Sequence, residues 1–542
     1  MERTKIKCNR LISDSISLPY TADPAEAFEI VRKRLCRFVQ VNSGGISYSV
    51  YRRSVDARRK DDIRFVYTIL AEAKEGFKAD PERISKEGFR IDDTTDLNFE
   101  FGTDKSSYRP IVVGCGPAGM FAALILAEQG YKPILIERGE ALADRISSVE
   151  SFFKTGVLNI ESNVMFGAGG AGTFSDGKLV TRINDPLGRY VINRLLEFGA
   201  PAEIAYMAKP HIGTDLLQGV VSNLLNMVLK YGGDIYYNCL LNSIMENDDG
   251  SVTVKTSLGD FRGSSIILAI GHSARDTYSY LNDNGYSMIA KPFSVGVRIE
   301  HLREDIERGL YGAHAGDPLL GAAEYALSDT KNGRGVYTFC MCPGGEVIAA
   351  SSEEGGLVVN GMSRHSRNGL NSNSAVAVSI RPDDYDGTPM GAVEYQRNLE
   401  RKAFAMGGGN FTAPIELLGD FLSGKTSSLK SPERIYPTYT RGCFNVSDIS
   451  EIFPSYVNEE LRYGFKSFAK KLPGFDAYDA VMTAVESRTS SPIRILRDES
   501  GIALGKNAIY PCGEGAGYAG GITSAAVDGI RTAIAVMKRW AP

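Results

Sequence analysis

A glycine-rich turn between two apolar segments constrains the fold of this chain more than any other feature of its sequence. Residues 111–137 read IVVGCGPAGMFAALILAEQGYKPILIE: a short apolar run, a turn, an apolar segment of helix length ending at Gly130, and a second apolar run. This strand–turn–helix–strand order predicts a βαβ unit and therefore a parallel sheet. The pattern G-x-G-x-x-G, from Gly114 to Gly119, lies where the first strand meets the helix.

The spacing of this turn is typical of dinucleotide binding. Gly114 permits the tight turn, Gly116 lets backbone N–H groups approach a pyrophosphate, and Gly119 lets the helix pack closely on the strand. Glu137 ends the second strand 18 positions after Gly119, where a carboxylate can accept hydrogen bonds from ribose hydroxyls. We therefore predict a cofactor-binding set made of Gly114, Gly116, Pro117, Ala118, Gly119, Glu137 and Arg138.

The C-terminal segment distinguishes FAD from NAD, which share the ADP half. Residues 510–523 read YPCGEGAGYAGGIT, a short strand followed by an acid and by glycines that open a helix. This segment resembles the second flavin motif of the glutathione-reductase-like FAD enzymes, with Glu514 where that family usually has aspartate. The resemblance implies FAD, and the N-terminus of the following helix would stabilise negative charge on a reduced flavin. Residues 266–272 partly resemble a strand of the same enzymes, and the two segments add Gly271, Gly513, Glu514, Gly520, Gly521 and Ile522 to the predicted contacts.

A dense glycine segment, FGAGGAGTFSDGKL at residues 166–179, lies between these motifs. Glutathione-reductase-like enzymes send a glycine-rich segment past the pyrophosphate and ribitol at this point. We therefore expect Gly169, Gly170 and Thr173 to line the FAD and Lys178 to face the flavin or the substrate, the alternative being a surface loop.

Two strings imitate a nucleotide-binding P-loop. Residues 172–178 match G-x-x-x-x-G-K, but Leu179 replaces the hydroxyl that would bind magnesium. Residues 419–426 read GDFLSGKT and match every letter, yet bulky Phe421 and Leu422 fill the loop and a stretch with two prolines follows. We predict that neither string binds a nucleoside triphosphate.

The sequence indicates catalytic residues less clearly than cofactor contacts, because a flavin carries the hydride chemistry itself and the protein has only to orient the substrate. We predict Lys178 and His365 as catalytic residues. The wider set of candidates lies in glycine-rich or turn-rich segments, where a structural histidine or an ion-paired arginine is the alternative; it comprises Lys178, His211, Arg298, Arg364, His365 and Arg488.

The eight cysteines are scattered and contain a single Cys-x-Cys, at Cys340 and Cys342. Their spacing predicts no metal site and no disulfide framework. The lack of Cys-x-x-Cys and Cys-x-x-x-x-Cys argues against a disulfide reductase, although a redox pair at Cys340 and Cys342 stays open.

Several segments together resemble the bacterial family of uncharacterised FAD-dependent dehydrogenases. They are FGAGGAGTFSDGKL, KPHIGTDLL, KPFSVGVRIEH, VYTFCMCPGGEVIAASSEEGGLVVNGMSRHSRNG and YPCGEGAGYAGGITSAAVDGI, with YRRSVDARRK near the N-terminus, and the resemblance spans roughly residues 45–540. It implies an FAD-dependent dehydrogenase acting on a small molecule that the family name does not specify. No second G-x-G-x-x-G follows a strand, so NADH or NADPH would have to dock transiently to reduce the flavin.

These features predict an α/β protein with a three-layer, glutathione-reductase-like FAD-binding Rossmann fold, an inserted mixed substrate or cap domain and a small N-terminal α/β domain. We expect the N-terminal domain at residues 1–105, the first part of the FAD domain at 106–285, the cap at 286–480 and the FAD-domain return at 481–542.

Charge and hydropathy predict the surroundings of the chain. Its 61 lysines and arginines nearly balance 65 aspartates and glutamates, so we expect neither a nucleic acid nor a membrane as partner. The N-terminal stretch lacks an apolar core of signal-peptide length, which favours a cytoplasmic protein; the sequence leaves the oligomeric state open. The alternative function is a flavoprotein that binds or modifies nucleic acid through a local basic patch, which a solvated hairpin rim would equally explain: Arg52, Arg53, Arg58, Arg59 and Lys60.

Overall fold

A computed structural model describes residues 6–39, 45–92, 97–181, 183, 185–331, 333–425 and 434–542. The chain divides into two compact units. The smaller comprises Met1–Asn98, Pro201–Pro210 and Glu307–Ala323, and the larger comprises Phe99–Ala200, His211–Ile306 and Glu324–Pro542. The predicted domain limits at residues 105, 285 and 480 stay predictions.

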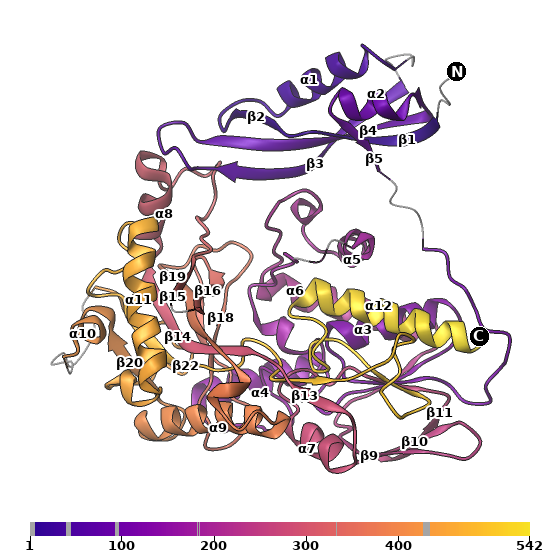
Figure 1. Cartoon of the computed structure of the whole chain (residues 1–542), viewed down its shortest axis with the longest axis vertical. Coiled ribbons are helices and arrows are strands. Elements are labelled where there is room, and N and C mark those ends of the chain that lie inside the picture. Colours follow the sequence, from indigo (N-terminus) through magenta and orange to yellow (C-terminus); the bar gives the residue numbers. More distant parts are fainter. Residues whose placement is uncertain are drawn as a thin grey trace. The chain divides into compact units, whose positions relative to one another are not determined.

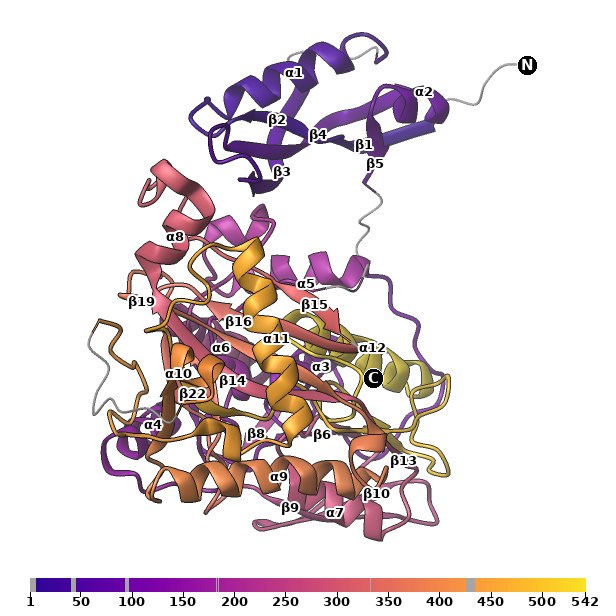
Figure 2. The same ribbon diagram turned by 60° about the vertical axis from the view of Figure 1, so that its left-hand side comes forward.

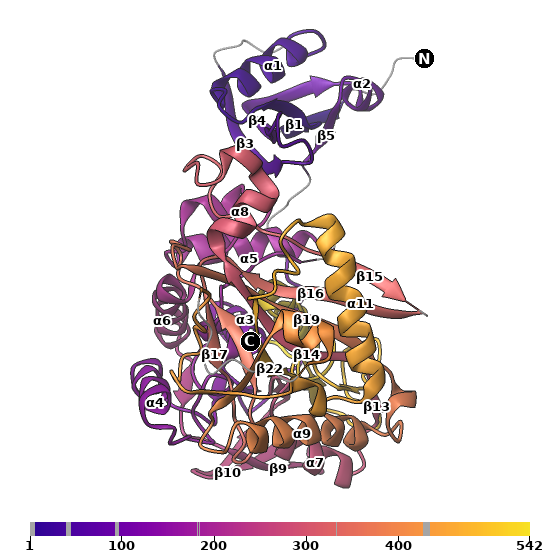
Figure 3. The same cartoon turned by 90° about the vertical axis from the view of Figure 1, so that its left-hand side faces the viewer.

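The smaller unit contains an antiparallel sheet with the strand order β2-β4-β1-β5, in which β3 also pairs with β4. Alternate side chains of β4, among them Phe65, Tyr67 and Ile69, are buried, as expected for a sheet with one face in the core. Helix α1 packs on this sheet (Figure 3). The elements are β1 (Ile6–Ser13), β2 (Ile16–Pro19), α1 (Ala25–Leu35), β3 (Ile46–Asp56), β4 (Arg64–Ala79), α2 (Pro81–Lys86) and β5 (Phe89–Ile91).

The alternation of apolar and polar residues over 38–53 predicts one long strand, but the observed strand β3 begins later. The backbone N–H groups of Phe38 and Val39 donate to the Leu35 carbonyl and complete the last turn after α1. The Phe38 ring packs on Phe89, with 5.5 Å between ring centroids. The strand β3 therefore starts at Ile46, and residues 40–44 and 93–96 lie outside the described residues.

The larger unit is built on a five-stranded parallel sheet with the order β24-β12-β6-β7-β8. In register, Ile266 pairs with Ile111 on one side and with Ile509 on the other. The C-terminal segment thus completes a sheet that begins near residue 111, and the predicted parallel sheet is confirmed. The strands are β6 (Ile111–Val113), β7 (Ile134–Ile136), β8 (Asp234–Tyr236), β12 (Ile266–Leu268) and β24 (Ile509–Pro511).

Two further layers cover this sheet. Helices α3 (Pro117–Glu128) and α12 (Ile522–Arg539) pack side by side (Figure 1), and the Val112 side chain points toward α3. Side chains alternate across a strand, so Ile111 and Val113 face the opposite way. There they share a core with Val252 and Val254 of the antiparallel meander β9 (Leu241–Glu246), β10 (Val252–Thr256) and β11 (Gly259–Gly263).

A second large sheet of the same unit has seven strands in the order β15-β16-β19-β14-β22-β20-β21, antiparallel except for the last pair. Helix α11 (Ser455–Lys471) packs across β15, β16 and β19 (Figure 2). The strands are β14 (Phe293–Leu302), β15 (Ser328–Lys331), β16 (Arg334–Cys342), β19 (Asn371–Ile380), β20 (Ala413–Leu417), β21 (Phe444–Val446) and β22 (Val481–Glu486).

The string that imitates a P-loop is not a loop. Gly419 lies inside the short helix α10 (Leu418–Ser423), and Gly424, with φ +66°, ends that helix; Thr426 lies outside the described residues. In the described part of the chain no helix is both long and apolar enough to cross a membrane. The remaining helices and strands are α4 (Leu142–Thr155), α5 (Pro186–Glu197), α6 (Thr214–Lys230), α7 (Arg275–Asp283), α8 (Arg303–Tyr311), α9 (Pro389–Met406), β13 (Met288–Ala290), β17 (Glu346–Ala349), β18 (Val359–Met362) and β23 (Ile493–Ile495).

Candidate functional site

A cavity of about 350 Å³ lies at the carboxyl ends of the strands of the parallel sheet. Its wall includes the residues that follow β6, β7, β12 and β24, and in open α/β sheets ligands bind at this edge. The cavity continues past the predicted cofactor motifs to residues of the seven-stranded sheet. The sequence-predicted residues that line it are Gly114, Gly116, Pro117, Ala118, Glu137, Arg138, Gly170, Lys178, Gly271, Glu514, Gly520, Gly521 and Ile522, together with Arg488 of the wider set.

The three glycines of the G-x-G-x-x-G turn have different structural roles. A Cβ on Gly114 would lie 2.3 Å from the Ala269 carbonyl oxygen, and one on Gly119 would lie 1.8 Å from the Gly114 oxygen. Both glycines therefore allow backbone segments to touch, and Gly119 does not line the cavity. A Cβ on Gly116 would meet nothing nearer than the Gly170 Cα at 3.9 Å, so this glycine leaves the backbone open toward the cavity.

Two helix N-termini face the cavity. Pro117 and Ala118 begin α3, and Gly521 and Ile522 begin α12. The first backbone N–H groups of a helix have no partner within it and carry partial positive charge. A Cβ on Gly520 or Gly521 would meet no atom within 4 Å. Two N–H-rich helix ends with open glycines fit the diphosphate and the electron-rich flavin edge of FAD.

Glu137 and Arg138 form the wall after β7. The Glu137 carboxylate is 6% exposed and accepts backbone N–H groups from Cys115 at 2.7 Å, Gly139 at 3.0 Å and Gly167 at 2.9 Å. It thus ties three loops together at the edge where a ribose was predicted. Arg138 donates to Glu161 and Asp276 and lies over the Phe166 ring.

Three predicted contacts lie behind the wall. The N–H of Gly169 donates to the Cys115 carbonyl at 2.8 Å, and the buried Thr173 hydroxyl donates to Ala168 at 3.4 Å. The N–H of Gly513 donates to Asp528 at 2.7 Å. These residues hold the glycine segment and the C-terminal turn in place, and none of them lines the cavity.

Glu514 lines the cavity close to the N-terminus of α12. Burial raises the pKa of its carboxyl group to about 7, and the nearby Lys291 ammonium offsets the shift only in part. The next residue, Gly515, lies against Gly271, with no room for a Cβ, and its carbonyl accepts the Tyr278 hydroxyl at 2.9 Å. Glu514 is therefore held at the cavity by its backbone, with a carboxyl group that titrates near neutral pH.

Lys178 lines the cavity within a cluster of charges. Its ammonium donates to Asp176 at 2.8 Å and to the Met341 carbonyl. Arg367 donates two hydrogen bonds to Asp176 and one to Glu324. Burial raises the pKa of Asp176, but Lys178 and Arg367 lower it by more, to about 2.

The charge of Lys178 follows from the same cluster. Burial lowers the pKa of Lys178, while Cys342, Asp176 and Glu324 raise it by more. Because burial also raises the pKa of the Cys342 thiol, that thiol is neutral at pH 7, and the two carboxylates keep Lys178 a cation.

The two predicted histidines lie beside this cluster. The rings of His211 and His365 stack with centroids 5.3 Å apart. An isolated antiparallel β-bridge between Lys178 and His211 connects the two histidines to the cavity wall. His365 itself does not line the cavity, and its Nδ1 lies 3.1 Å from the Ile212 carbonyl oxygen. The neighbouring Arg364 is exposed.

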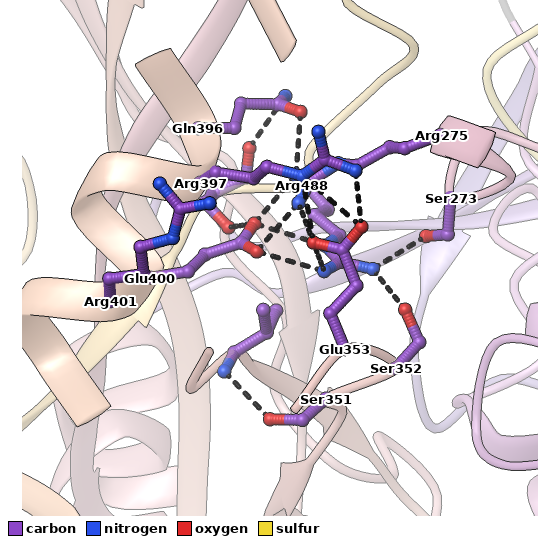
Figure 4. A network of polar contacts seen from close by, with 12 residues as sticks. Ser273, Arg275, Ser351, Ser352, Glu353, Gln396, Arg397, Glu400, Arg401 and Arg488 are labelled. Atoms are coloured by element: carbon purple, nitrogen blue, oxygen red, sulfur yellow. Dashed lines mark hydrogen bonds and ion pairs between the residues drawn. The ribbon is translucent and has the colours of Figure 1, made fainter. Parts of the chain in front are cut away.

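A buried network of charges supports the cavity (Figure 4). Glu400 accepts from Arg275 and Arg488, and Glu353 accepts from Arg275 and Arg397. Arg488 also donates to Ser273 and Ser352. Every nitrogen of Arg488 therefore donates within the protein. Arg298 likewise donates from every nitrogen, to Glu486, Asn373, Asn360 and the Cys340 carbonyl.

Sequence reasoning missed several residues of the wall, and His272 is the most informative. Burial lowers the pKa of His272 to about 4, aided by the charges of Arg488 and Arg275, so its ring is neutral at pH 7. The Ser273 hydroxyl accepts a hydrogen bond from Arg488, and its oxygen lies 2.9 Å from His272 Nδ1. Other missed wall residues, which had no motif to reveal them, include Met165, Phe166, Phe339, Asn360 and Thr489.

Both cysteines of the Cys-x-Cys line the cavity. Cys340 has φ +43°, and the pairing of β16 with β19 shifts between Phe339 and Cys342. The Cys342 thiol donates to the Cys340 carbonyl at 3.2 Å. Burial raises the pKa of Cys340 to about 12, so both thiols are protonated at neutral pH.

Comparison with known proteins identifies the cofactor. Residues 292–489 match the family described as "FAD-dependent protein, C-terminal domain-like", and residues 14–72 match "Domain of unknown function (DUF8436)". A protein of Clostridium beijerinckii, described as "Uncharacterized protein", is 44% identical over 516 residues, covering 94% of this chain and 96% of the relative. FAD is the cofactor of this chain, in agreement with the prediction.

Solved flavoprotein structures show weaker likenesses. CtdE in complex with FAD is 12% identical, covers 80% of this chain and 84% of its own, and has a TM-score of 0.31. The halogenase PltM in complex with phloroglucinol and FAD is 12% identical over 79% and 67%, with a TM-score of 0.35. The tetracycline destructase Tet(51) is 10% identical over 78% and 79%, with a TM-score of 0.30. Scores this low carry over neither substrate nor reaction.

Proposed function

The chain belongs to the same family as the Clostridium beijerinckii protein, and on that premise we propose that it is an FAD-dependent oxidoreductase of the dehydrogenase type. It transfers a hydride between bound flavin and a small molecule, on a glutathione-reductase-like FAD-binding arrangement. The observation that carries the proposal is one cavity whose wall contains two glycine-opened helix ends together with Lys178, Asn360 and Phe339.

Bound FAD supplies the capacity to accept a hydride, while the substrate's second hydrogen is released as a proton. The residues of the chain position and shield the reactants. The N-terminus of α3 would hold the diphosphate, and the N-terminus of α12 would stabilise negative charge on the flavin. Met165, Phe166 and Phe339 give the cavity apolar walls that exclude water. Lys178 orients the substrate as a cation.

The remaining features of the proposal follow from the sequence. Residues 106–285 and 481–542 form the FAD domain and residues 286–480 the cap, in a cytoplasmic protein. NADH or NADPH reduces the flavin by transient docking, since the chain has no second G-x-G-x-x-G after a strand.

Anaerobic reduction of the bound flavin tests this function. The purified FAD-loaded protein is mixed without oxygen with NADH, NADPH and a panel of small metabolites, and the visible flavin absorbance is followed. We expect at least one donor to bleach the flavin. Flavin that dithionite bleaches but no donor in the panel does would contradict the dehydrogenase proposal and favour a non-catalytic FAD scaffold.

The alternative, nucleic-acid binding through the basic patch, loses support from the pairing of its charges. Arg58 pairs with Asp56 and Arg59 with Asp61, while Arg53 lies over the Phe65 ring. Filter binding to RNA across a salt series distinguishes the two functions, because phosphate contacts give a steep salt dependence. We expect no binding even at low salt.

A further inference from the structure

The end of the cavity away from the cofactor motifs presents one amide group with a fixed orientation. Asn360, in β18, accepts at Oδ1 from Arg298 Nη2 and from the Gly361 N–H, both at 2.7 Å. Neither group can accept a hydrogen bond, so the amide oxygen must face them and Nδ2 must point elsewhere. Among the described residues Nδ2 has no partner, and Asn360 lines the cavity.

The surroundings of Asn360 are built to hold this orientation. A Cβ on Gly361 would lie 2.4 Å from Arg298 Nη1 and 2.5 Å from Asn373 Oδ1. Only glycine therefore leaves space for the Arg298 guanidinium beneath the strand. Arg298 is fully buried and anchored by Glu486 at 2.7 Å, so the acceptor face of Asn360 is fixed and its two amide hydrogens face the cavity.

A second donor lines the same end. Lys178 donates to Asp176 and to the Met341 carbonyl, which leaves one of its three N–H groups. Two successive carbonyls of β16 connect the donors: Lys178 donates to the Met341 carbonyl, and Arg298, which holds the Asn360 oxygen, donates to the Cys340 carbonyl. An ammonium and an amide thus share one wall, and the described residues that line this end offer no carboxylate to them beyond Asp176, which Lys178, Arg367 and Ser363 already occupy.

The balance of charge sets how much negative charge the site can take. In the described ion pairs of Lys178 and of Arg298, the residue that fixes Asn360, the cationic groups and the carboxylates are equal in number. Arg298 and Arg488 donate from every nitrogen to the protein, so neither can chelate a dianion. The groups counted are Lys178, Arg298 and Arg367, against Asp176, Glu324 and Glu486.

We propose that Lys178 and Asn360 bind the carboxylate of a small monoanionic organic acid, which is the substrate class of this enzyme. The proposal rests on the proposed function, since it takes this end of the cavity as the substrate end. A carboxylate accepts one hydrogen bond from each donor, and Phe339 gives its carbon skeleton an apolar wall. Asn360 is thereby the residue that selects an acceptor over a donor at this position.

Isothermal titration calorimetry on the FAD-loaded, oxidised protein tests the proposal without turnover. The probes are acetate and benzoate as carboxylates, benzamide as the neutral isostere of benzoate, and benzylamine as a cation. We expect the wild type to bind benzoate at least about tenfold more tightly than benzamide. Asn360→Asp keeps the oxygen that Arg298 and Gly361 require and changes only the cavity-facing atom, so it should reverse this preference and favour benzylamine. Lys178→Met should weaken benzoate by at least about tenfold.

Asn373→Asp is the matched control, because Asn373 also accepts from Arg298 but is fully buried and does not line the cavity. It should leave the order of probe affinities unchanged. Asn360→Asp with the wild-type preference, or a wild type that binds neither carboxylate while retaining FAD, would overturn the proposal. So would variants that shift the flavin spectrum or lower FAD content yet keep the benzoate preference, because the donors would then serve the cofactor. Failure of the dehydrogenase proposal shows separately, as flavin that no donor reduces.

Discussion

Arg488 donates hydrogen bonds to both carboxylate oxygens of Glu400, from Nε to Oε1 at 3.0 Å and from Nη2 to Oε2 at 2.8 Å. The two residues are 88 positions apart in the chain and both are buried, and Arg275 bonds the same carboxylate. The pair joins the strand region after β22 to helix α9 directly behind the cavity wall.

Glu400→Gln should destabilise the protein by about 3–5 kcal/mol, because it leaves two buried guanidinium groups without their carboxylate. Chemical denaturation measures the change. The control is Glu394→Gln, which breaks the exposed pair with Arg401 and should change the free energy of unfolding by less than about 1 kcal/mol. Equal effects of the two substitutions would show that the buried network does not stabilise the fold.

Gly119→Ala should weaken FAD binding by at least about tenfold, or about 1.4 kcal/mol, because its Cβ would collide with the Gly114 carbonyl and distort the turn. The flavin-to-protein ratio after dialysis measures this loss. Gly219→Ala is the control, since Gly219 lies on an exposed position of α6 with open space around it. It should retain FAD and stabilise the protein by about 0.5–1 kcal/mol. Gly119→Ala with full flavin content would contradict the assignment of the turn.

Glu514→Gln should remove part of the pH dependence of stability. The folded pKa of Glu514 is about 7 and its ordinary value is 4.5, so the folded state holds this proton more tightly than the unfolded state. Stability therefore falls as the pH rises from 4.5 to 7, by about 3 kcal/mol in total for this group. Denaturation of both proteins at pH 4.5, 6 and 7.5, at one FAD concentration, should show the wild type losing stability relative to Glu514→Gln. Parallel pH profiles of stability for the wild type and Glu514→Gln would contradict the raised pKa and show that the Glu514 carboxyl group is solvated.

Lys178→Ala should change the visible spectrum of the bound flavin and lower turnover with any donor that reduces it by at least about tenfold, because it removes a cation from the cavity. Absorbance spectroscopy and stopped-flow reduction measure the two effects. Lys425→Ala is the matched control, since Lys425 closes the other G-x-x-x-x-G-K string, next to the short helix α10 and away from the cavity. An unchanged spectrum together with unchanged turnover in Lys178→Ala would remove Lys178 from the site.

Local patterns were sufficient where a function depends on backbone conformation. The turn at Gly114–Gly119 and the segment at Gly513–Ile522 predicted a parallel sheet and FAD, because glycine spacing, a strand and a helix start all lie within short stretches of sequence. The same reasoning rejected the string at residues 419–426, and Gly419 indeed lies in a helix. Gly169, Thr173 and Gly513 could not be separated from true wall residues, because whether a loop residue faces a cavity or supports it depends on packing.

By itself, the sequence determined the βαβ unit, the returning strand and the cofactor, since each rests on contacts between near neighbours or on a motif with its own geometry. Only the tertiary structure decided which polar groups remain available. Arg298 and Arg488 looked like substrate ligands, yet partners up to 215 residues away occupy all their nitrogens. Asn360 belongs to no motif that would mark it as a ligand, and its amide NH2 group is available to a ligand because Arg298 holds its oxygen. Each N–H group donates one hydrogen bond, and the fold of the chain determines which acceptor receives it.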